Sequence, residues 1–153
     1  MEFKAKARTC LFLAHQAEEA ASFYVGLLPG SEIDAVYRPQ PDGPALVVEF
    51  TLGGAPFMAM NGNPEPTPSH LTSISVLTED QAETDRLWAA LTAGGEEGRC
   101  GWLRDCYGVH WQIVPKALPR LMGEGGATAQ LVSGALMKMK KIVIADLEAA
   151  ARS

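Results

Sequence analysis

The chain has 153 residues, of which 47% are hydrophobic and 20% charged, and its formal net charge is −5. This length suits a single domain, residues 1–153, that buries a core without disulfides or a structural metal. The acidic balance argues against nucleic acid or an anionic membrane surface as a partner. No run approaches the roughly 18 apolar residues of a membrane span. We therefore expect a cytoplasmic protein, whose three cysteines are free thiols.

The first half of the chain predicts one helix among four strands. Apolar residues at helical spacing, followed by Pro29-Gly30, predict a helix that ends at that pair. Gly53-Gly54 between two apolar runs is a strong signal for a hairpin turn. The elements expected over residues 8–61, in chain order, are a buried strand (8–14), a helix (16–28), a strand (31–38) and two hairpin strands (45–52 and 56–61). This order is βαβββ.

The second half repeats the order and adds a helical tail. Three prolines between residues 61 and 69 predict a linker. The elements expected over residues 70–115 are a strand (71–78), a helix (80–93) with Ala82, Leu87, Trp88 and Leu91 inward, a short or irregular strand around residues 96–98, a short strand (99–104) and a strand (109–114). The tail, residues 116–153, predicts a helical turn (118–122) and two helices (127–139 and 142–151). We expect this apolar tail to cap the sheet or dock on a second subunit.

A diverged internal repeat supports this division. The triplet Gln16-Ala17-Glu18 returns as Gln81-Ala82-Glu83, and Phe23 falls on Trp88 at the same offset (88 − 23 = 65). Such a repeat is the signature of a chain built twice from one structural unit. Two similar half-sheets should then meet at a cleft, which is where we expect the functional site.

Three segments carry a resemblance to a known family. They are "QAEEAASFYVGLLPGSEI", "DRLWAALTAGGEEGRCGWLRDCYGVHWQIVP" and "VSGALMKMKKI". The chain resembles the glyoxalase-like branch of the vicinal oxygen chelate superfamily, and within it the family named 3-demethylubiquinone-9 3-methyltransferase. The resemblance implies an α+β fold in which two βαβββ modules form a curved mixed sheet around a shared cavity. It also implies a homodimer.

The resemblance implies metal-ligand positions that this chain does not fill with metal ligands. Relatives such as glyoxalase I take two histidines and two glutamates from the first and last strands of each half. The positions that correspond here hold Thr9, Met58 or Met60, Leu71 and Gln112. His70 stands one residue from Leu71 and so on the opposite face of the expected strand. Because thioethers and a neutral amide do not replace anionic hard ligands, we expect no catalytic metal.

The family name implies S-adenosylmethionine, yet no glycine pair lies where such a cofactor would need it. A nucleotide-type cofactor normally requires a glycine-rich loop that follows a strand and opens a helix. The pairs Gly53-Gly54, Gly94-Gly95 and Gly125-Gly126 are expected at a hairpin turn, a helix end and a linker. We therefore expect no cofactor.

Two polar residues on strands are candidates for acid–base chemistry. Glu49 stands in the middle of an apolar strand, and His110 shares a strand face with Gln112. A Glu49–His110 pair is a candidate acid/base couple, or half of an unusual metal site. The alternative places both side chains on the solvent faces of their strands.

The expected ligand is a small apolar or aromatic molecule, because aromatic walls with a few fixed polar groups are typical of small-molecule sites. The residues expected to line its site are Phe57, Met58, Met60, Trp102, Trp111 and Gln112. The predicted function is binding of that molecule, without catalytic metal. The alternative is an enzyme, either the named methyltransferase or a metal-dependent lyase or dioxygenase with a remodelled centre that uses His70, His110 and Glu49.

Overall fold

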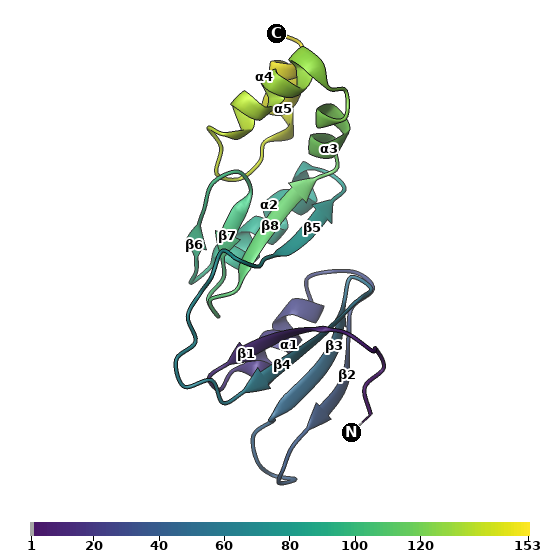
Figure 1. Ribbon diagram of the computed structural model, residues 1–153, viewed down its shortest axis with the longest axis vertical. Coiled ribbons are helices and arrows are strands. Elements are labelled where there is room, and N and C mark those ends of the chain that lie inside the picture. The colour runs from purple at the N-terminus through teal and green to yellow at the C-terminus, as the bar shows by residue number, and fades with distance from the viewer. Residues whose placement is uncertain (1) are drawn as a thin grey trace. The chain divides into compact units, whose positions relative to one another are not determined.

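The computed structural model describes residues 2–153, which form two compact units (Figure 1). The first unit ends at Thr67 and the second spans Pro68–Ser153. The boundary falls inside the proline-containing linker expected between residues 61 and 69.

The first unit has the βαβββ order expected for residues 8–61. Its elements are β1 (Thr9–Leu13), α1 (Ala17–Val25), β2 (Glu32–Tyr37), β3 (Val47–Leu52) and β4 (Ala55–Asn61). The strands form one sheet in the order β1-β4-β3-β2, in which only β1 and β4 are parallel. Gly53 and Gly54, both at positive φ, make the expected β3–β4 turn.

Helix α1 covers one face of this sheet. The ring of Tyr24 lies 6.4 Å from that of Phe50, and the Phe50 ring stacks on Phe57 at 5.4 Å. Tyr24 and Phe50 are fully buried. Since side chains alternate along a strand, Glu49 and Met58 lie on the other face, which we call the open face of the first unit.

Strand β1 is not the buried strand that its apolar sequence predicts. It lies at the edge of the sheet, and Phe12 is 43% exposed. The edge position explains the difference, because β1 has a neighbouring strand on one side only.

The second unit repeats the first. Its sheet is built from β5 (Ile74–Thr78), β6 (Glu96–Glu97), β7 (Trp102–Arg104) and β8 (His110–Pro115), with α2 (Gln81–Thr92) between β5 and β6. The order β5-β8-β7-β6 matches that of the first sheet, and β5 and β8 are the parallel pair. The offset of 65 residues also relates β1 to β5 (74 − 9 and 78 − 13). The predicted duplication is therefore present as two sheets of one topology.

Helix α2 begins at the Asp80 N-cap, whose carboxylate accepts the N–H of Glu83. Leu87, Trp88 and Leu91 face inward as expected. Ala82 does not, and is exposed. The inward position in the first turn belongs instead to Thr84, whose hydroxyl pairs with that of Thr78 at 2.6 Å.

Strand β5 begins later than predicted, and this changes the place of His70. Leu71 is 91% exposed and lies in a turn, where its N–H donates to the Ser69 hydroxyl. The strand starts at Ile74. His70 therefore precedes the strand and does not occupy the strand face opposite Leu71, as the sequence suggested.

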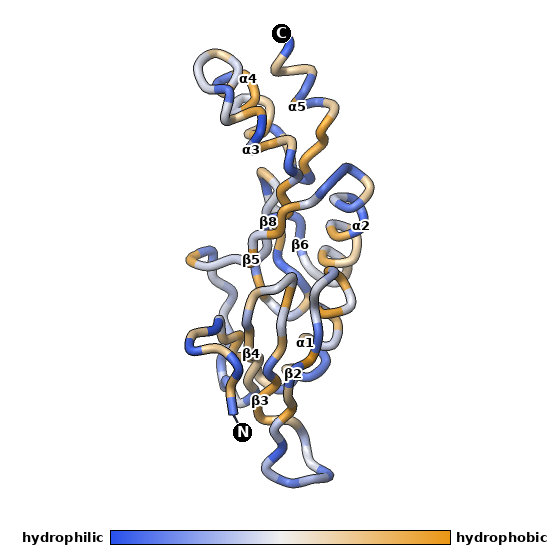
Figure 2. Tube along the Cα trace, turned by 90° about the vertical axis from the view of Figure 1, so that its right-hand side faces the viewer, coloured by the Kyte–Doolittle hydropathy of each residue, from blue (hydrophilic) through white to orange (hydrophobic). Residues whose placement is uncertain are grey.

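The tail forms α3 (Ala117–Met122), α4 (Gly126–Leu136) and α5 (Ile144–Ala151) around a core of its own. Figure 2 shows the strongly hydrophobic segment that leads into α5. The buried residues of this core are Leu121, Val132, Ile142 and Leu147. None of the described helices is long and apolar enough to cross a membrane.

The tail is fastened to the rest of the second unit by polar contacts. The Gln81 amide donates to the Ile142 carbonyl at 3.0 Å and accepts the Ile144 N–H at 2.7 Å. The N–H groups of Cys100 and Gly101 donate to the Met139 and Lys140 carbonyls. The tail thus packs against α2 and the turn before β7. All three cysteines are free thiols, as expected.

We predict that Gln81→Ala destabilises the second unit by about 1–3 kcal/mol, because two backbone groups lose their partner. Urea unfolding followed by far-UV circular dichroism measures the change. Gln130→Ala is the matched control, since that glutamine is exposed on α4. Equal stability of the two variants would contradict the role given to Gln81.

Candidate functional site

The open face of the second sheet carries the polar and aromatic side chains of this unit. In the β7–β8 pair, Trp102 stands opposite Gln112, and Arg104 stands opposite His110. Directly paired residues share a face, so all four lie together. Leu103 and the other fully buried residues of these strands lie on the face that α2 covers.

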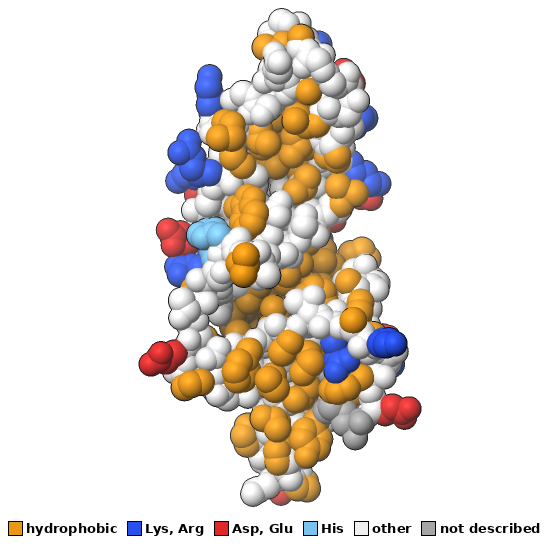
Figure 3. All heavy atoms as spheres, in the orientation of Figure 1, with side chains coloured by type: hydrophobic (Ala, Val, Ile, Leu, Met, Phe, Trp, Pro, Cys, Tyr) orange, Lys and Arg blue, Asp and Glu red, His pale blue; other side chains and the backbone are white. Residues whose placement is uncertain are grey.

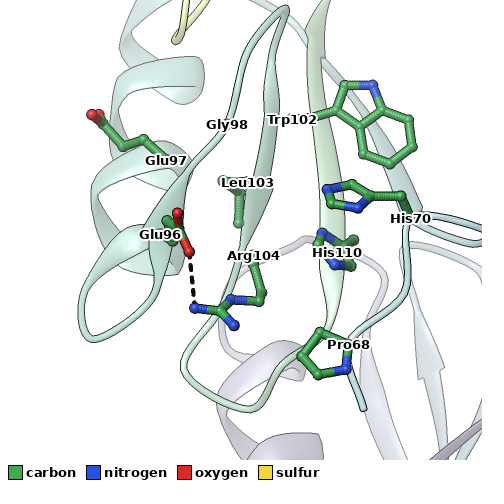
Figure 4. A pocket seen from close by; sticks show the side chains of 9 residues that line it. All are labelled: Pro68, His70, Glu96, Glu97, Gly98, Trp102, Leu103, Arg104 and His110. Carbon is green, nitrogen blue, oxygen red and sulfur yellow. Dashed lines mark hydrogen bonds and ion pairs between the residues drawn. The ribbon is translucent and has the colours of Figure 1, made fainter.

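A cleft of about 200 Å³ lies over this open face (Figure 4). Its walls come from the segment before β5, from β6 and from the β7–β8 pair. The lining residues are Pro68, His70, Glu96, Glu97, Gly98, Trp102, Leu103, Arg104 and His110. Figure 4 shows the His70 imidazole reaching over the sheet between Trp102 and His110.

Three rings form one wall of the cleft. The centroids of the His70 and His110 rings are 4.1 Å apart, with 36° between their planes. The His70 and Trp102 rings are 6.1 Å apart, with 45° between their planes. A planar apolar group can pack against such a wall and gain stacking contacts.

An ion pair closes the opposite side. Arg104 Nη2 donates to Glu96 Oε2 at 3.0 Å. Glu97 is turned away from this pair in Figure 4. Its carboxylate accepts the Trp88 indole N–H at 2.7 Å and lies 3.8 Å from Lys140 Nζ. The Arg104–Glu96 pair leaves little net charge at this side of the cleft.

His110 is 7% exposed, and its pKa lies below the ordinary value of 6.5. Burial is the largest cause, and the neighbouring His70 and Arg104 charges lower the pKa further. The carboxylates of Asp105 and Glu96 oppose the shift without reversing it. At pH 7 the imidazole is therefore neutral, with one nitrogen that accepts a hydrogen bond and one that donates.

Asp105 holds the β7–β8 turn in place, which fixes His110. One carboxylate oxygen accepts the N–H groups of Tyr107 and Val109, and the other accepts the Trp111 indole N–H at 2.9 Å. The signal for the observed role is an Asp three residues before a glycine, because Asp side chains cap the backbone of tight turns.

The expected ligand-lining residues divide among different faces. Trp102 lines the cleft, and Gln112 lies on the same face with its amide donating to Ser73 Oγ at 2.9 Å. Trp111 is 1% exposed on the helix-covered face and does not line this cleft. Phe57 also faces its helix, because it stacks on Phe50.

Met58 and Met60 lie on the open face of the first unit, in the same unit as Glu49. Glu49 is 3% exposed, and Oε1 accepts the N–H of Lys4 at 2.9 Å. Glu49 and His110 are both buried, although each lies on the open face of its own sheet and not on the helix-covered face. The cleft residues that the sequence did not single out are Pro68, Glu96, Glu97, Gly98, Leu103 and Arg104.

Among residues 2–153, no three His, Cys, Asp or Glu side chains gather closely enough to hold a metal ion. The glycine pairs do not form a loop between a strand and a helix. Gly125-Gly126 opens α4, a feature that the sequence placed in a linker, but the pair follows α3 and not a strand.

The sequence profile of the 3-demethylubiquinone-9 3-methyltransferase family matches residues 5–114. A PhnB protein from Bacillus cereus, named as a candidate member of that family, has a similar solved structure. It is 32% identical, with a TM-score of 0.63, over 72% of this chain and 99% of that one.

More distant structures share the fold alone. Protein PA1353 from Pseudomonas aeruginosa is 23% identical, with a TM-score of 0.59, over 73% of this chain and 98% of that one. The fosfomycin resistance protein FosX from Listeria monocytogenes is 11% identical, with a TM-score of 0.54, over 74% and 94%. No curated protein matches the sequence.

The matched profile covers most of the two sheets, including the strands that carry the cleft. The predicted α+β fold is confirmed, with two four-stranded mixed sheets and a helical tail. The chain belongs to the 3-demethylubiquinone-9 3-methyltransferase family, within the glyoxalase-like vicinal oxygen chelate superfamily.

Proposed function

We propose that the protein binds a small, largely apolar or aromatic molecule in the cleft of the second unit, without a catalytic metal. The observation that carries this proposal is the wall formed by the Trp102, His70 and His110 rings. Such a wall offers flat, partly apolar surface to one face of a planar ligand.

The size and charge of the cleft limit the kinds of ligand that fit it. Its volume of about 200 Å³ is below the roughly 300–1,000 Å³ of drug-sized sites, so a one- or two-ring compound fits best. Glu96 already pairs with Arg104, so the site needs no strongly charged ligand for neutrality. A neutral aromatic molecule with one hydroxyl or carbonyl group meets both conditions.

His110 supplies the polar contact. Its neutral imidazole can accept a hydrogen bond from a ligand hydroxyl or donate one to a carbonyl. The pKa of His110 is lowered chiefly by burial, and further because protonation would place a charge beside His70 and Arg104. Ligand binding through His110 as an acceptor therefore weakens when the pH falls through the pKa of this imidazole.

The alternative remains an enzyme, as the family name implies. A variant of FosX from Listeria monocytogenes has been crystallised with Mn(II) and a dihydroxypropylphosphonic acid, which shows that a protein of this fold can hold a metal and a small organic acid. Thermal-shift titration with S-adenosylmethionine and with Mn(II) separates the alternatives. Our proposal predicts no saturable shift with either, and a stoichiometric complex with either would overturn it.

We predict that Trp102→Ala weakens binding of 2-naphthol at least about 10-fold, because the largest ring of the wall is lost. Equilibrium dialysis measures the dissociation constant. Tyr37→Ala is the control, since Tyr37 is an aromatic residue of the first unit that is 43% exposed. The proposal is contradicted if both variants bind 2-naphthol as the unaltered protein does.

We predict that His70→Ala raises the pKa of His110, because the variant removes a neighbouring charge and part of the burial. Nuclear magnetic resonance titration of the imidazole C–H signals measures this pKa. The sign for stability follows from the lowered pKa: the contribution of His110 is complete above pH 6.5 and declines as the pH falls from there toward the folded-state value. An unchanged His110 titration in His70→Ala would contradict the coupling.

A further inference from the structure

The open face of the first unit carries a buried carboxylate in apolar surroundings. Glu49 lies on the central strand β3, opposite Met58 on β4, and Met58 in turn stands opposite Cys10 on β1. Figure 3 shows hydrophobic side chains gathered over the strands of this unit. An ionised carboxylate in such a place is costly unless donors surround it.

One donor from the chain's own N-terminal segment, residues 2–8, reaches Glu49. The Lys4 backbone N–H donates to Glu49 Oε1 at 2.9 Å, whereas Oε2 is buried and has no hydrogen-bond partner among the described residues. A carboxylate can accept about four hydrogen bonds. The acceptor capacity of Glu49 is therefore only partly used.

The Lys4 side chain does not compensate the charge of Glu49 directly. Its Nζ binds Asp34 Oδ1 at 2.6 Å, and Asp34 Oδ2 accepts the Thr51 hydroxyl. Burial alone would raise the pKa of Asp34, but these hydrogen bonds outweigh it and hold that pKa below its ordinary value. Lys4 is thus fixed on Asp34, with only its amide N–H on Glu49.

The segment that places Lys4 there is a thin surface strap. It has no helix or strand, and Figure 1 shows it passing the β2–β3 side of the sheet before it enters β1. Apart from the Lys4 contacts, its Arg8 guanidinium stacks 3.4 Å from the Phe3 ring. Because so few contacts hold this segment, a ligand can replace them with contacts of its own.

We infer that Glu49 anchors a second binding site, whose ligand is an apolar molecule with an amidinium or ammonium group. In the absence of that ligand, the backbone of Lys4 occupies the site. The amide of Lys4 shows the chemistry that Glu49 accepts, namely an N–H donor. An amidinium offers two parallel N–H groups, which satisfy Oε1 and Oε2 together. The thioether of Met58 and its apolar neighbours contact the rest of the molecule.

Benzamidine is the probe for this site, and Lys4→Pro is the decisive variant because proline removes the competing N–H. Isothermal titration calorimetry should show binding about 10-fold tighter in Lys4→Pro, as one competing hydrogen bond to a charged group is lost. Lys6→Pro is the matched control, since it introduces proline into the same segment and retains the Lys4 N–H. It should bind like the unaltered chain.

Glu49→Gln in the Lys4→Pro background should abolish binding, with folding verified by its thermal unfolding curve. Neutral benzamide should bind none of these proteins at this site. The inference fails if Lys4→Pro binds no more tightly than Lys6→Pro, or if Glu49→Gln leaves the affinity for benzamidine unchanged. Binding of 2-naphthol in the other unit is independent of either result.

Discussion

Side-chain alternation on a four-stranded sheet with a single covering helix is the constraint on which the rest of this structure depends. In each unit the helix buries one set of alternate residues, such as Phe50 and Tyr24 in the first. The other set is left on an open face. Polar groups there face either solvent, a ligand or another part of the chain. Glu49 and His110 both belong to that set, and both are nevertheless buried.

The two open faces differ in the groups that surround their buried polar residue. His110 is buried beneath His70 and beside the Arg104–Glu96 pair, and the low pKa that results keeps it neutral. Glu49 is buried beneath a backbone segment that supplies one N–H. The first arrangement favours a neutral aromatic ligand, and the second favours a cationic one. Duplication of one topology has therefore produced two chemically different surfaces.

The fold could be predicted largely from local patterns. The Gly53-Gly54 turn, the helix stop at Pro29-Gly30 and the repeat between the two helices each depend on neighbouring residues, and the sheets follow from them. The positions that hold metal ligands in relatives could be located only through the family resemblance, and not from local patterns. The exposure of β1 was not predictable in this way, because its edge position is decided by strand order.

The site was less predictable because it depends on non-local contacts. His70 reaches His110 only because a turn at Ser69 delays β5 to Ile74. Glu96 meets Arg104 through the two-residue strand β6. The sequence indicated a short or irregular strand around residues 96–98, but not the residue with which it pairs. Once the β7–β8 register is known, side-chain alternation places His110, Gln112 and Trp102 on one face of the sheet. The same alternation places Trp111 on the other face.

The most direct measurement is the chemical-shift change of the His70 and His110 imidazole signals on titration with 2-naphthol. The account predicts saturable shifts of both imidazoles and of the Trp102 indole N–H, with the Trp88 and Trp111 signals changing less. Saturable binding that leaves both imidazoles and Trp102 unshifted would contradict the placement of the ligand in this cleft.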